Sequence, residues 1–302
     1  MLSQADNHHK DLQSALRVLI SAGGKRIRPT ITMLIGNMLN APKDRLLTLA
    51  AAIELLHTAT LVHDDLIDGS LLRRGMPTLN SRWSPGATVL TGDFLFARAA
   101  KLAAETESIP VMKIFSRTLT TIVNGEINQL LGSHCLANRD DYFQRIYAKT
   151  ASLFETSAWA AALISQTDDT VIENMKQYGL EIGTAFQIID DILDFTGEQV
   201  TVGKPVGSDL RQGLITLPTL YYFEENPSHP DVHAILEGNC PQDEETLQRL
   251  IECIRQSNAI EKAYSDAKQF VQRGLERMRQ LAVSSERLAL EDLANYIIQR
   301  RI

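Results

Sequence analysis

Hydrophobic residues recur at helical spacing along nearly the whole chain. Leu12, Leu16 and Leu19 fall on one face of a first amphipathic segment. A longer run, rich in leucine and alanine, predicts one helix over 44–68. The other helices are expected at 11–21, 30–40, 88–106, 110–131, 140–165 and 216–223, with a helix or helix pair over 168–195, a short helix in 224–241 and two or three in 243–302. No stretch alternates with period two for long, so we predict an all-α fold.

Two stretches interrupt the helical pattern. Residues 69–86 contain glycines and prolines and are expected to form turns. Residues 196–213 are rich in glycine, form the longest stretch without periodicity, and are the best candidate for a mobile loop. Asp140 or Asp141 is expected to cap the helix at 140–165, because a carboxylate accepts hydrogen bonds from the first helical N–H groups. No linker divides the chain convincingly, so we predict one domain, 1–302.

Composition narrows the class of protein. Hydrophobic residues make up 44% and charged residues 22% of the 302 positions, as in a soluble globular protein. The net charge of −7 argues against a nucleic-acid surface. Cys135, Cys240 and Cys253 lack metal-ligand spacing and are typical of reduced thiols. Because residues 1–10 are polar and no apolar run reaches the roughly 20 residues that span a bilayer, we expect a cytoplasmic protein without a transmembrane segment.

Two copies of the pattern Asp-Asp-x-x-Asp end two of the long predicted helices. They are Asp64-Asp65-Leu66-Ile67-Asp68 and Asp190-Asp191-Ile192-Leu193-Asp194. Residues four apart share a helix face, so the first and last carboxylates of each motif repel unless a cation joins them. A hard divalent metal takes oxygen ligands and also attracts phosphates. One such motif is typical of a solvated helix end, whereas two matched copies inside apolar runs favour a metal-assisted diphosphate site.

Basic residues lie close to the acidic motifs in the sequence. Lys25 and Arg28 are held between Gly23-Gly24 and Pro29, and Arg73-Arg74 follows the first motif. Arginine fits phosphate oxygens in a bidentate way, and lysine acts as a point charge. Each of these residues taken singly is an ordinary surface charge. Their placement beside the acidic motifs favours two phosphate sites, one held through metal and one by direct contact.

Several short motifs, which run in order from about residue 22 to 220, carry a resemblance to a known family. They are Gly23-Gly24-Lys25-Arg26-Ile27-Arg28-Pro29, His57, the first acidic motif, Arg73-Arg74-Gly75-Met76-Pro77-Thr78, Gly92-Asp93-Phe94-Leu95, Lys149-Thr150, Phe186-Gln187 with the second acidic motif, Gly203-Lys204 and Thr216-Leu217-Pro218. Together they resemble the trans-isoprenyl (polyprenyl) diphosphate synthases. The resemblance implies a large single-domain helical bundle around a central cavity, and a prenyltransferase that joins isopentenyl diphosphate to an allylic diphosphate.

The resemblance also implies roles for the matching residues. Asp64, Asp68 and Asp190 would ligate Mg²⁺, about three ions per active site, while Asp65, Asp191 and Asp194 would support those ligands directly or through water. Arg73, Lys149 and Lys204 would contact the allylic diphosphate, Lys25, Arg28, His57 and Arg74 would hold isopentenyl diphosphate, and Thr150 and Gln187 would turn oxygen dipoles toward the carbocation. The implied reaction is ionisation, attack by the isopentenyl double bond and loss of a proton, with the released pyrophosphate as the expected acceptor.

One position departs from the family pattern. Many relatives carry lysine before Thr-Leu-Pro, at the position that Leu214 occupies here. This weakens the case for a basic contact there, and Arg211 is a candidate to replace it.

The length of the product is expected to depend on the helix that carries the first motif. Short-chain relatives have bulky aromatic residues four and five positions before the first aspartate, where this chain has Thr60 and Ala59. We therefore predict a product longer than farnesyl, of medium or long chain, with a geranylgeranyl-length product as the alternative. Leu56, or a residue in 122–128, is almost as good a candidate for the floor of the cavity.

Three other classes compete with a condensing synthase. A class I terpene cyclase also ionises a prenyl diphosphate, but the second Asp-Asp-x-x-Asp and the Lys25/Arg28 site argue against it. A di-iron bundle would carry paired Glu-x-x-His motifs, and Glu54-x-x-His57 occurs once. A non-catalytic subunit normally lacks the aspartate motifs. We expect a homodimer, with a heterodimer left open.

Overall fold

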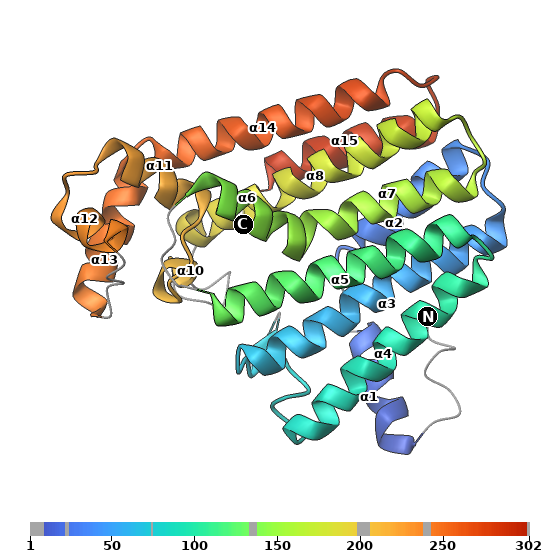
Figure 1. The fold of residues 1–302 in the computed structure, drawn as a ribbon, viewed down its shortest axis with the longest axis horizontal. Coiled ribbons are helices and arrows are strands. Elements are labelled where there is room, and N and C mark those ends of the chain that lie inside the picture. The colour runs from blue at the N-terminus through green and yellow to red at the C-terminus, as the bar shows by residue number, and fades with distance from the viewer. Residues whose placement is uncertain are drawn as a thin grey trace. The chain divides into compact units, whose positions relative to one another are not determined.

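The computed structural model describes residues 9–21, 24–73, 75–132, 138–197, 206–237 and 243–300, and the prediction of an all-α fold is confirmed (Figure 1). The chain divides into two compact units, each described below by itself. The first comprises Met1–Arg117 and Thr156–Glu173, and the second Thr118–Glu155 and Asn174–Ile302. Each acidic motif belongs to a different unit. The prediction of one domain stays a prediction.

The long helix α3 is the centre of the first unit. The helices of this unit are α1 (Lys10–Ser21), α2 (Ile27–Met38), α3 (Lys43–Ile67), α4 (Pro85–Glu105), the first part of α5 (Ile109–Leu131), most of α7 (Ser152–Ile164) and the first turn of α8 (Asp169–Thr196). α3 packs against α4 and α2, and Leu46, Ile53 and Leu56 on it are fully buried. A Cβ on Gly92 would lie 2.1 Å from His63 Nε2, so glycine is what allows α4 to approach α3 so closely. The apolar composition of α3 on most sides is that of a core helix.

α3 also meets the length and composition of a membrane-spanning helix. In its most apolar window, 61% of the residues are buried inside the structure, and the core helix of a soluble protein passes the same test. The expected absence of a transmembrane segment therefore stays a prediction.

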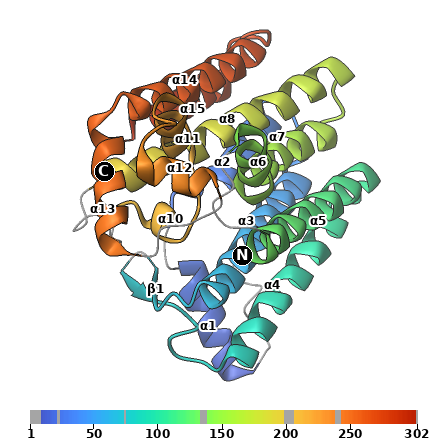
Figure 2. The same ribbon diagram turned by 60° about the vertical axis from the view of Figure 1, so that its left-hand side comes forward.

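The second unit contains the remaining helices. They are the rest of α5, α6 (Arg139–Ile146), the π-helical turn η2 (Tyr147–Ala151), the first turn of α7, most of α8, α10 (Ser208–Arg211), α11 (Leu217–Glu225), α12 (Pro230–Leu236), α13 (Glu244–Gln256), α14 (Ala259–Met278) and α15 (Ser285–Gln299). α14 packs against α11 and α15, and it lies beside α15 in both views (Figures 1 and 2). Tyr178 of α8 is fully buried and its hydroxyl donates to the Leu290 carbonyl at 2.9 Å.

Four local features differ from the sequence-based expectation. The helix expected over 140–165 is interrupted by η2, where one extra residue per turn changes the direction of the following side chains. Its cap is Asn138, whose side chain accepts from Asp141 N, and not Asp140 or Asp141. The turn region 69–86 contains a small hairpin of β1 (Leu72–Arg73) and β2 (Met76–Pro77). The stretch 196–213 includes α10, while 198–205 lies outside the described residues.

Candidate active site

The first acidic motif occupies the last turn of α3. Asp65 is buried, and its Oδ1 accepts a hydrogen bond from Arg73 Nε at 2.8 Å. Asp64 is half-buried, and Asp68, which caps the helix, is exposed. Carbonyl groups give a helix C-terminus a partial negative charge, so carboxylates there repel both one another and the helix end. A bound cation would relieve this repulsion.

The second acidic motif lies near the end of α8, and its outer aspartates have different partners. Asp190 Oδ1 is 2.7 Å from Arg300 Nη2, and the Arg300 guanidinium lies over the Phe186 ring at 4.5 Å from its centroid. Asp194 accepts three hydrogen bonds from the start of α10: from Ser208 N at 3.1 Å, Ser208 Oγ at 2.8 Å and Asp209 N at 3.1 Å. The first aspartate therefore faces a cation, whereas the last holds a turn of the backbone.

Asp191, the middle aspartate of the second motif, is buried between two neutral groups. The Tyr142 hydroxyl donates to its Oδ2 at 2.7 Å and Gln187 Nε2 donates to its Oδ1 at 2.8 Å. Burial, with a further contribution from the charge of Asp209, raises the pKa of Asp191 to about 8. Burial and then the neighbouring Asp191 raise the pKa of Tyr142 well above its ordinary value. The hydrogen bonds keep this carboxyl group inside the protein.

The π-helical turn places Lys149 and Thr150. Thr150 is buried, and its hydroxyl donates to Gln187 Oε1 at 2.6 Å. Lys149 is exposed, and its Nζ is 3.2 Å from Glu126 Oε1 of α5. A Cβ on Gly183 would lie 2.8 Å from the Ala151 Cα, so glycine lets α8 approach this turn closely. Both polar ends of Gln187 are thus bonded within the protein, to Thr150 and to Asp191.

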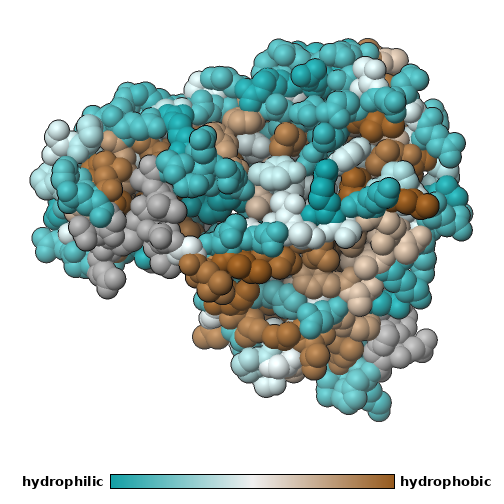
Figure 3. All heavy atoms as spheres, viewed as in Figure 1, coloured by the Kyte–Doolittle hydropathy of each residue, from teal (hydrophilic) through white to brown (hydrophobic). Residues whose placement is uncertain are grey.

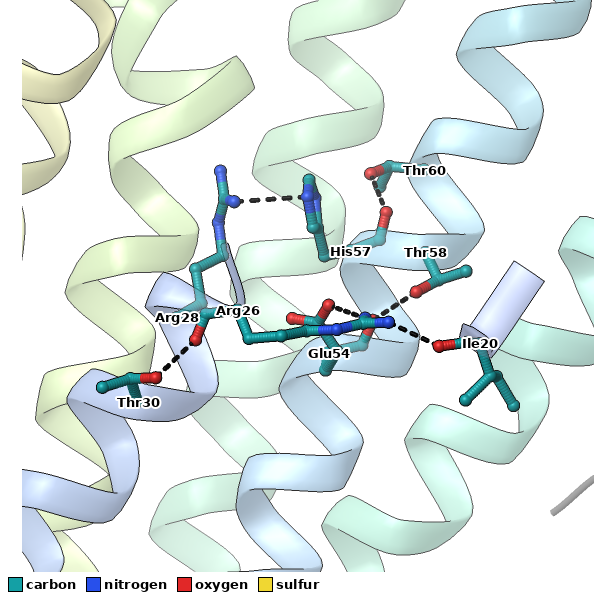
Figure 4. Close-up of polar contacts among 8 residues, drawn as sticks. All are labelled: Ile20, Arg26, Arg28, Thr30, Glu54, His57, Thr58 and Thr60. Carbon is teal, nitrogen blue, oxygen red and sulfur yellow. Dashed lines mark hydrogen bonds and ion pairs between the residues drawn. The ribbon is translucent and has the colours of Figure 1, made fainter. Parts of the chain in front are cut away.

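The predicted second phosphate site brings Arg28 and His57 together. Arg28 Nη1, at the start of α2, is 3.3 Å from His57 Nε2 on α3 (Figure 4). A guanidinium carries only donors, so Arg28 donates in this contact and the His57 ring nitrogen accepts. Lys25 precedes α2 and is exposed. Of the three described candidates for this site, Lys25 and Arg28 come from the loop before α2 and its first turn, and His57 comes from α3.

Several predicted residues lie elsewhere or outside the described part of the chain. Arg74 and Lys204 lie outside the described residues, as do Gly23 and Gly203. Leu214 lines a pocket of about 430 Å³ in the second unit, with Arg145 and Gly213 among its other walls. Arg211 does not line this pocket. Its guanidinium donates to Glu244 and, at 3.0 Å, to Gln248 of α13. The suggestion that Arg211 replaces a lysine stays a prediction.

The two residues expected to set product length follow each other on α3. Ala59 is fully buried, and Thr60 is half-buried with its hydroxyl bonded to the His57 carbonyl at 2.8 Å. Leu56, the competing candidate for the floor, is also fully buried. Burial alone does not separate these candidates.

Among the described residues, no group of three or more acidic, histidine or cysteine side chains within the structure is arranged to hold a metal ion. The donor set nevertheless suits Mg²⁺, because all of its candidate ligands are hard carboxylate oxygens. Asp190 already forms an ion pair with a cationic group, the Arg300 guanidinium. The carboxylates therefore fit a divalent metal by their chemistry.

Several partners of the site were not found by sequence reasoning. They are Tyr142, Arg300, Ser208, Asp209, Glu126 and Arg26. Most lie far in the sequence from the residue that they contact; Tyr142 is 49 residues from Asp191. Neither periodicity nor a local motif signals such a pair.

The chain is similar to proteins of one family. The family model described as polyprenyl synthetase matches residues 9–254. The heptaprenyl diphosphate synthase component 2 of Geobacillus stearothermophilus is 36% identical, over 93% of this chain and 88% of that protein. The geranylgeranyl diphosphate synthase of Saccharolobus solfataricus is 34% identical, over 98% and 92%. A solved structure of polyprenyl synthase from Caulobacter crescentus, complexed with calcium and isoprenyl diphosphate, has a TM-score of 0.90 and 36% identity, over 100% of this chain and 92% of that one.

Proposed function

This chain belongs to the polyprenyl synthetase family, and we propose that it lengthens an allylic diphosphate with isopentenyl diphosphate in a metal-assisted reaction. It is a transferase of prenyl groups. The product would be longer than farnesyl.

The observation that carries the proposal is that α3 carries residues of two different candidate sites for a diphosphate. One is the contact of His57 with the cationic Arg28, and the other is the carboxylate motif that begins at Asp64. His57, which meets Arg28, precedes Asp64 by seven residues, or about 10 Å along a helix. A cationic site therefore lies two turns from a carboxylate site on one rigid element. An enzyme that joins two diphosphates needs both, whereas a cyclase, which ionises one diphosphate, does not need the cationic site.

The first three metal candidates, Asp64, Asp68 and Asp190, would hold Mg²⁺ on the allylic diphosphate. When bound, the metal would neutralise the charge of the departing pyrophosphate. The relative from Caulobacter crescentus, whose structure holds calcium with isoprenyl diphosphate, supports the use of a divalent ion. Asp65, Asp191 and Asp194 would hold their surroundings in place, since each bonds a protein group.

The other residues would bind and orient the substrates. The candidates for phosphate contacts are Arg73 and Lys149. Arg74 and Lys204, which lie outside the described residues, are candidates as well. The allylic C–O bond would break, the isopentenyl double bond would attack the resulting cation to form a C–C bond, and a proton would leave the new cation for the released pyrophosphate. The Thr150 oxygen would face the cation, held in its orientation by Gln187.

Condensation itself is tested by incubating the protein with Mg²⁺, isopentenyl diphosphate and several allylic primers. We expect each accepted primer to gain five-carbon units, and chromatography of the products gives their length. A primer that is converted without consuming isopentenyl diphosphate would favour the cyclase instead.

Product length is tested with Thr60→Phe. A bulky ring one turn before Asp64 should shorten the main product if this position limits the cavity. Thr48→Phe is the matched control, since Thr48 is also half-buried on α3 but lies three turns earlier. An unchanged product distribution in Thr60→Phe would move the floor to Leu56 or to 122–128. The relatives include one named for a geranylgeranyl product and one named for a heptaprenyl product, so both product lengths occur in the family.

The partner that we propose is a second copy of the chain. Val123, Ile127, Leu130 and Leu131 form an apolar stripe on the second half of α5, with exposures of 42 to 78%, and apolar side chains gather over this end of the helix (Figure 3). Such a stripe favours burial against another surface. Light scattering should give a dimer that Leu130→Asp dissociates. A monomeric wild-type chain would favour a different protein as partner, as the name of the component 2 relative implies for that protein.

A further inference from the structure

Glu54 and Arg26 form an ion pair that the proposed reaction does not use. Glu54 lies on α3, three residues before His57, and its side chain is 6% exposed. Arg26 Nη1 donates to Glu54 Oε1, and Arg26 Nη2 donates to the Ile20 carbonyl of α1 at 2.5 Å (Figure 4). Because a buried carboxylate is costly without a cation, this pair ties the start of α2 to α3 and α1.

Arg26 also fixes the backbone between Lys25 and Arg28. Arg26 adopts the left-handed conformation, with φ of 49° and ψ of 34°. This conformation is energetically unfavourable for residues other than glycine. Its carbonyl accepts from Thr30 N at 3.0 Å and from Thr30 Oγ1 at 2.7 Å. The side-chain contacts of Arg26 hold this strained turn, so they also fix how Lys25 and Arg28 leave it.

Two neighbouring contacts therefore join α2 to α3. Figure 4 shows the Arg28 side chain turned toward His57, while Arg26 extends toward Glu54 and Ile20. Residues three apart on a helix are neighbours, so Glu54 sets the position of His57 relative to this loop. The pair of Arg26 and Glu54 is neutral overall, whereas the Arg28 and His57 pair presents positive charge for a phosphate.

We propose that Arg26 and Glu54 are positioning residues for the isopentenyl diphosphate site. They hold Lys25 and Arg28 at the correct distance from His57, and Glu54 keeps the Arg26 guanidinium away from the substrate. This inference rests on the proposed function, because it assigns isopentenyl diphosphate to the Arg28 and His57 pair.

The test is Glu54→Gln, which keeps the shape of the side chain and removes its charge. We expect the KM for isopentenyl diphosphate to rise by about tenfold, with the KM for the allylic primer nearly unchanged, since only one substrate contacts this site. Calorimetry in EDTA should show weaker binding of isopentenyl diphosphate to the metal-free variant. Arg26→Lys, which keeps the charge, should fall between the wild type and Glu54→Gln.

Two further variants separate positioning from loss of stability. Arg45→Met removes an exposed ion pair at the start of α3, where Arg45 is 2.7 Å from Glu107, and should change neither KM. If Glu54→Gln does not fold, the double variant Arg26→Met/Glu54→Met leaves no buried charge and should keep the selective rise in KM. A folded Glu54→Gln or double variant with both KM values of the wild type would overturn the positioning role.

The outcomes also distinguish this inference from the proposed function. A wild-type chain that neither binds nor consumes isopentenyl diphosphate would overturn both. A wild-type chain that does both, beside a variant whose two KM values rise equally, would overturn the positioning role alone.

Discussion

The two acidic motifs share one sequence pattern but have different surroundings. In both, the middle aspartate is buried and bonded to the protein: Asp65 to the cationic Arg73, and Asp191 to the neutral Tyr142 and Gln187. The last aspartate is exposed in the first motif, at Asp68, but bonded to α10 in the second, at Asp194. The same five-residue pattern thus offers two outer carboxylates on α3 and one on α8, so the pattern alone does not assign metal ligands.

The largest effects are expected where a carboxylate is proposed to hold metal. Asp64→Ala and Asp190→Ala should each lower kcat by about a hundredfold to a thousandfold, because the charge of the departing pyrophosphate is no longer neutralised. Steady-state assays at saturating Mg²⁺ measure this loss. Asp194→Asn, which keeps most of its hydrogen bonds to α10, should lose much less. Equal losses in all three variants would remove the proposed difference between the motifs.

The middle aspartates should differ in stability. Asp65→Asn weakens a charged hydrogen bond to Arg73, so we expect the free energy of unfolding to fall by about 1–3 kcal/mol. Asp191→Asn should cost less than about 1 kcal/mol near neutral pH, since its partners are neutral and burial already favours the uncharged form. Urea unfolding of the metal-free proteins compares the two. The reverse order would contradict the assigned surroundings.

The cation beside Asp190 allows a finer test. Arg300→Met removes the guanidinium that Asp190 now faces, so we expect severalfold tighter Mn²⁺ binding in a titration followed by electron paramagnetic resonance. Arg273→Met is a matched control, because Arg273 pairs with Glu181 of α8 at 3.0 Å, away from the motif. Weaker Mn²⁺ binding in Arg300→Met would mean that the arginine helps to hold the metal site.

The smallest expected effect is a pH dependence. Burial raises the pKa of Asp191 from its ordinary value of 3.8 to about 8, so the folded state binds this proton more tightly than the unfolded state. The stability due to this proton is fully present below about pH 4 and is lost as the pH rises through about 8. Thermal melts in EDTA should therefore show a fall in melting temperature from pH 6 to 9 that Asp191→Asn reduces. Equal slopes in both proteins would assign the dependence to other groups.

The spacing of hydrophobic residues predicted the helices well, because each helix buries an apolar face or is buried on most sides. The long helix that carries Asp64 is expected over 44–68 and observed at Lys43–Ile67. The π-helical turn at Thr150 was missed because every residue from Thr150 to Phe154 is buried, so a change of direction at the turn leaves no contrast between polar and apolar faces in the sequence. The hairpin at Leu72–Arg73 was missed because two-residue strands have no measurable period.

The candidate site was predicted by residue type but not by environment. Sequence motifs selected the six aspartates and the Arg28 and His57 pair. They did not indicate which aspartates are bonded to the protein, since partners such as Tyr142 and Arg300 meet them only through tertiary packing. Glu54 illustrates the same limit: its spacing from His57 allowed a metal role, whereas its burial against Arg26 favours a structural one.

The most direct measurement is a crystal structure with Mn²⁺ and a non-hydrolysable thiodiphosphate analogue of an allylic substrate, with the metal located by anomalous scattering. We predict that Mn²⁺ binds to carboxylate oxygens of Asp64, Asp68 and Asp190, while Asp65, Asp191 and Asp194 keep their protein hydrogen bonds. Metal bound by Asp65, Asp191 or Asp194 instead, or by only one motif, would contradict the account.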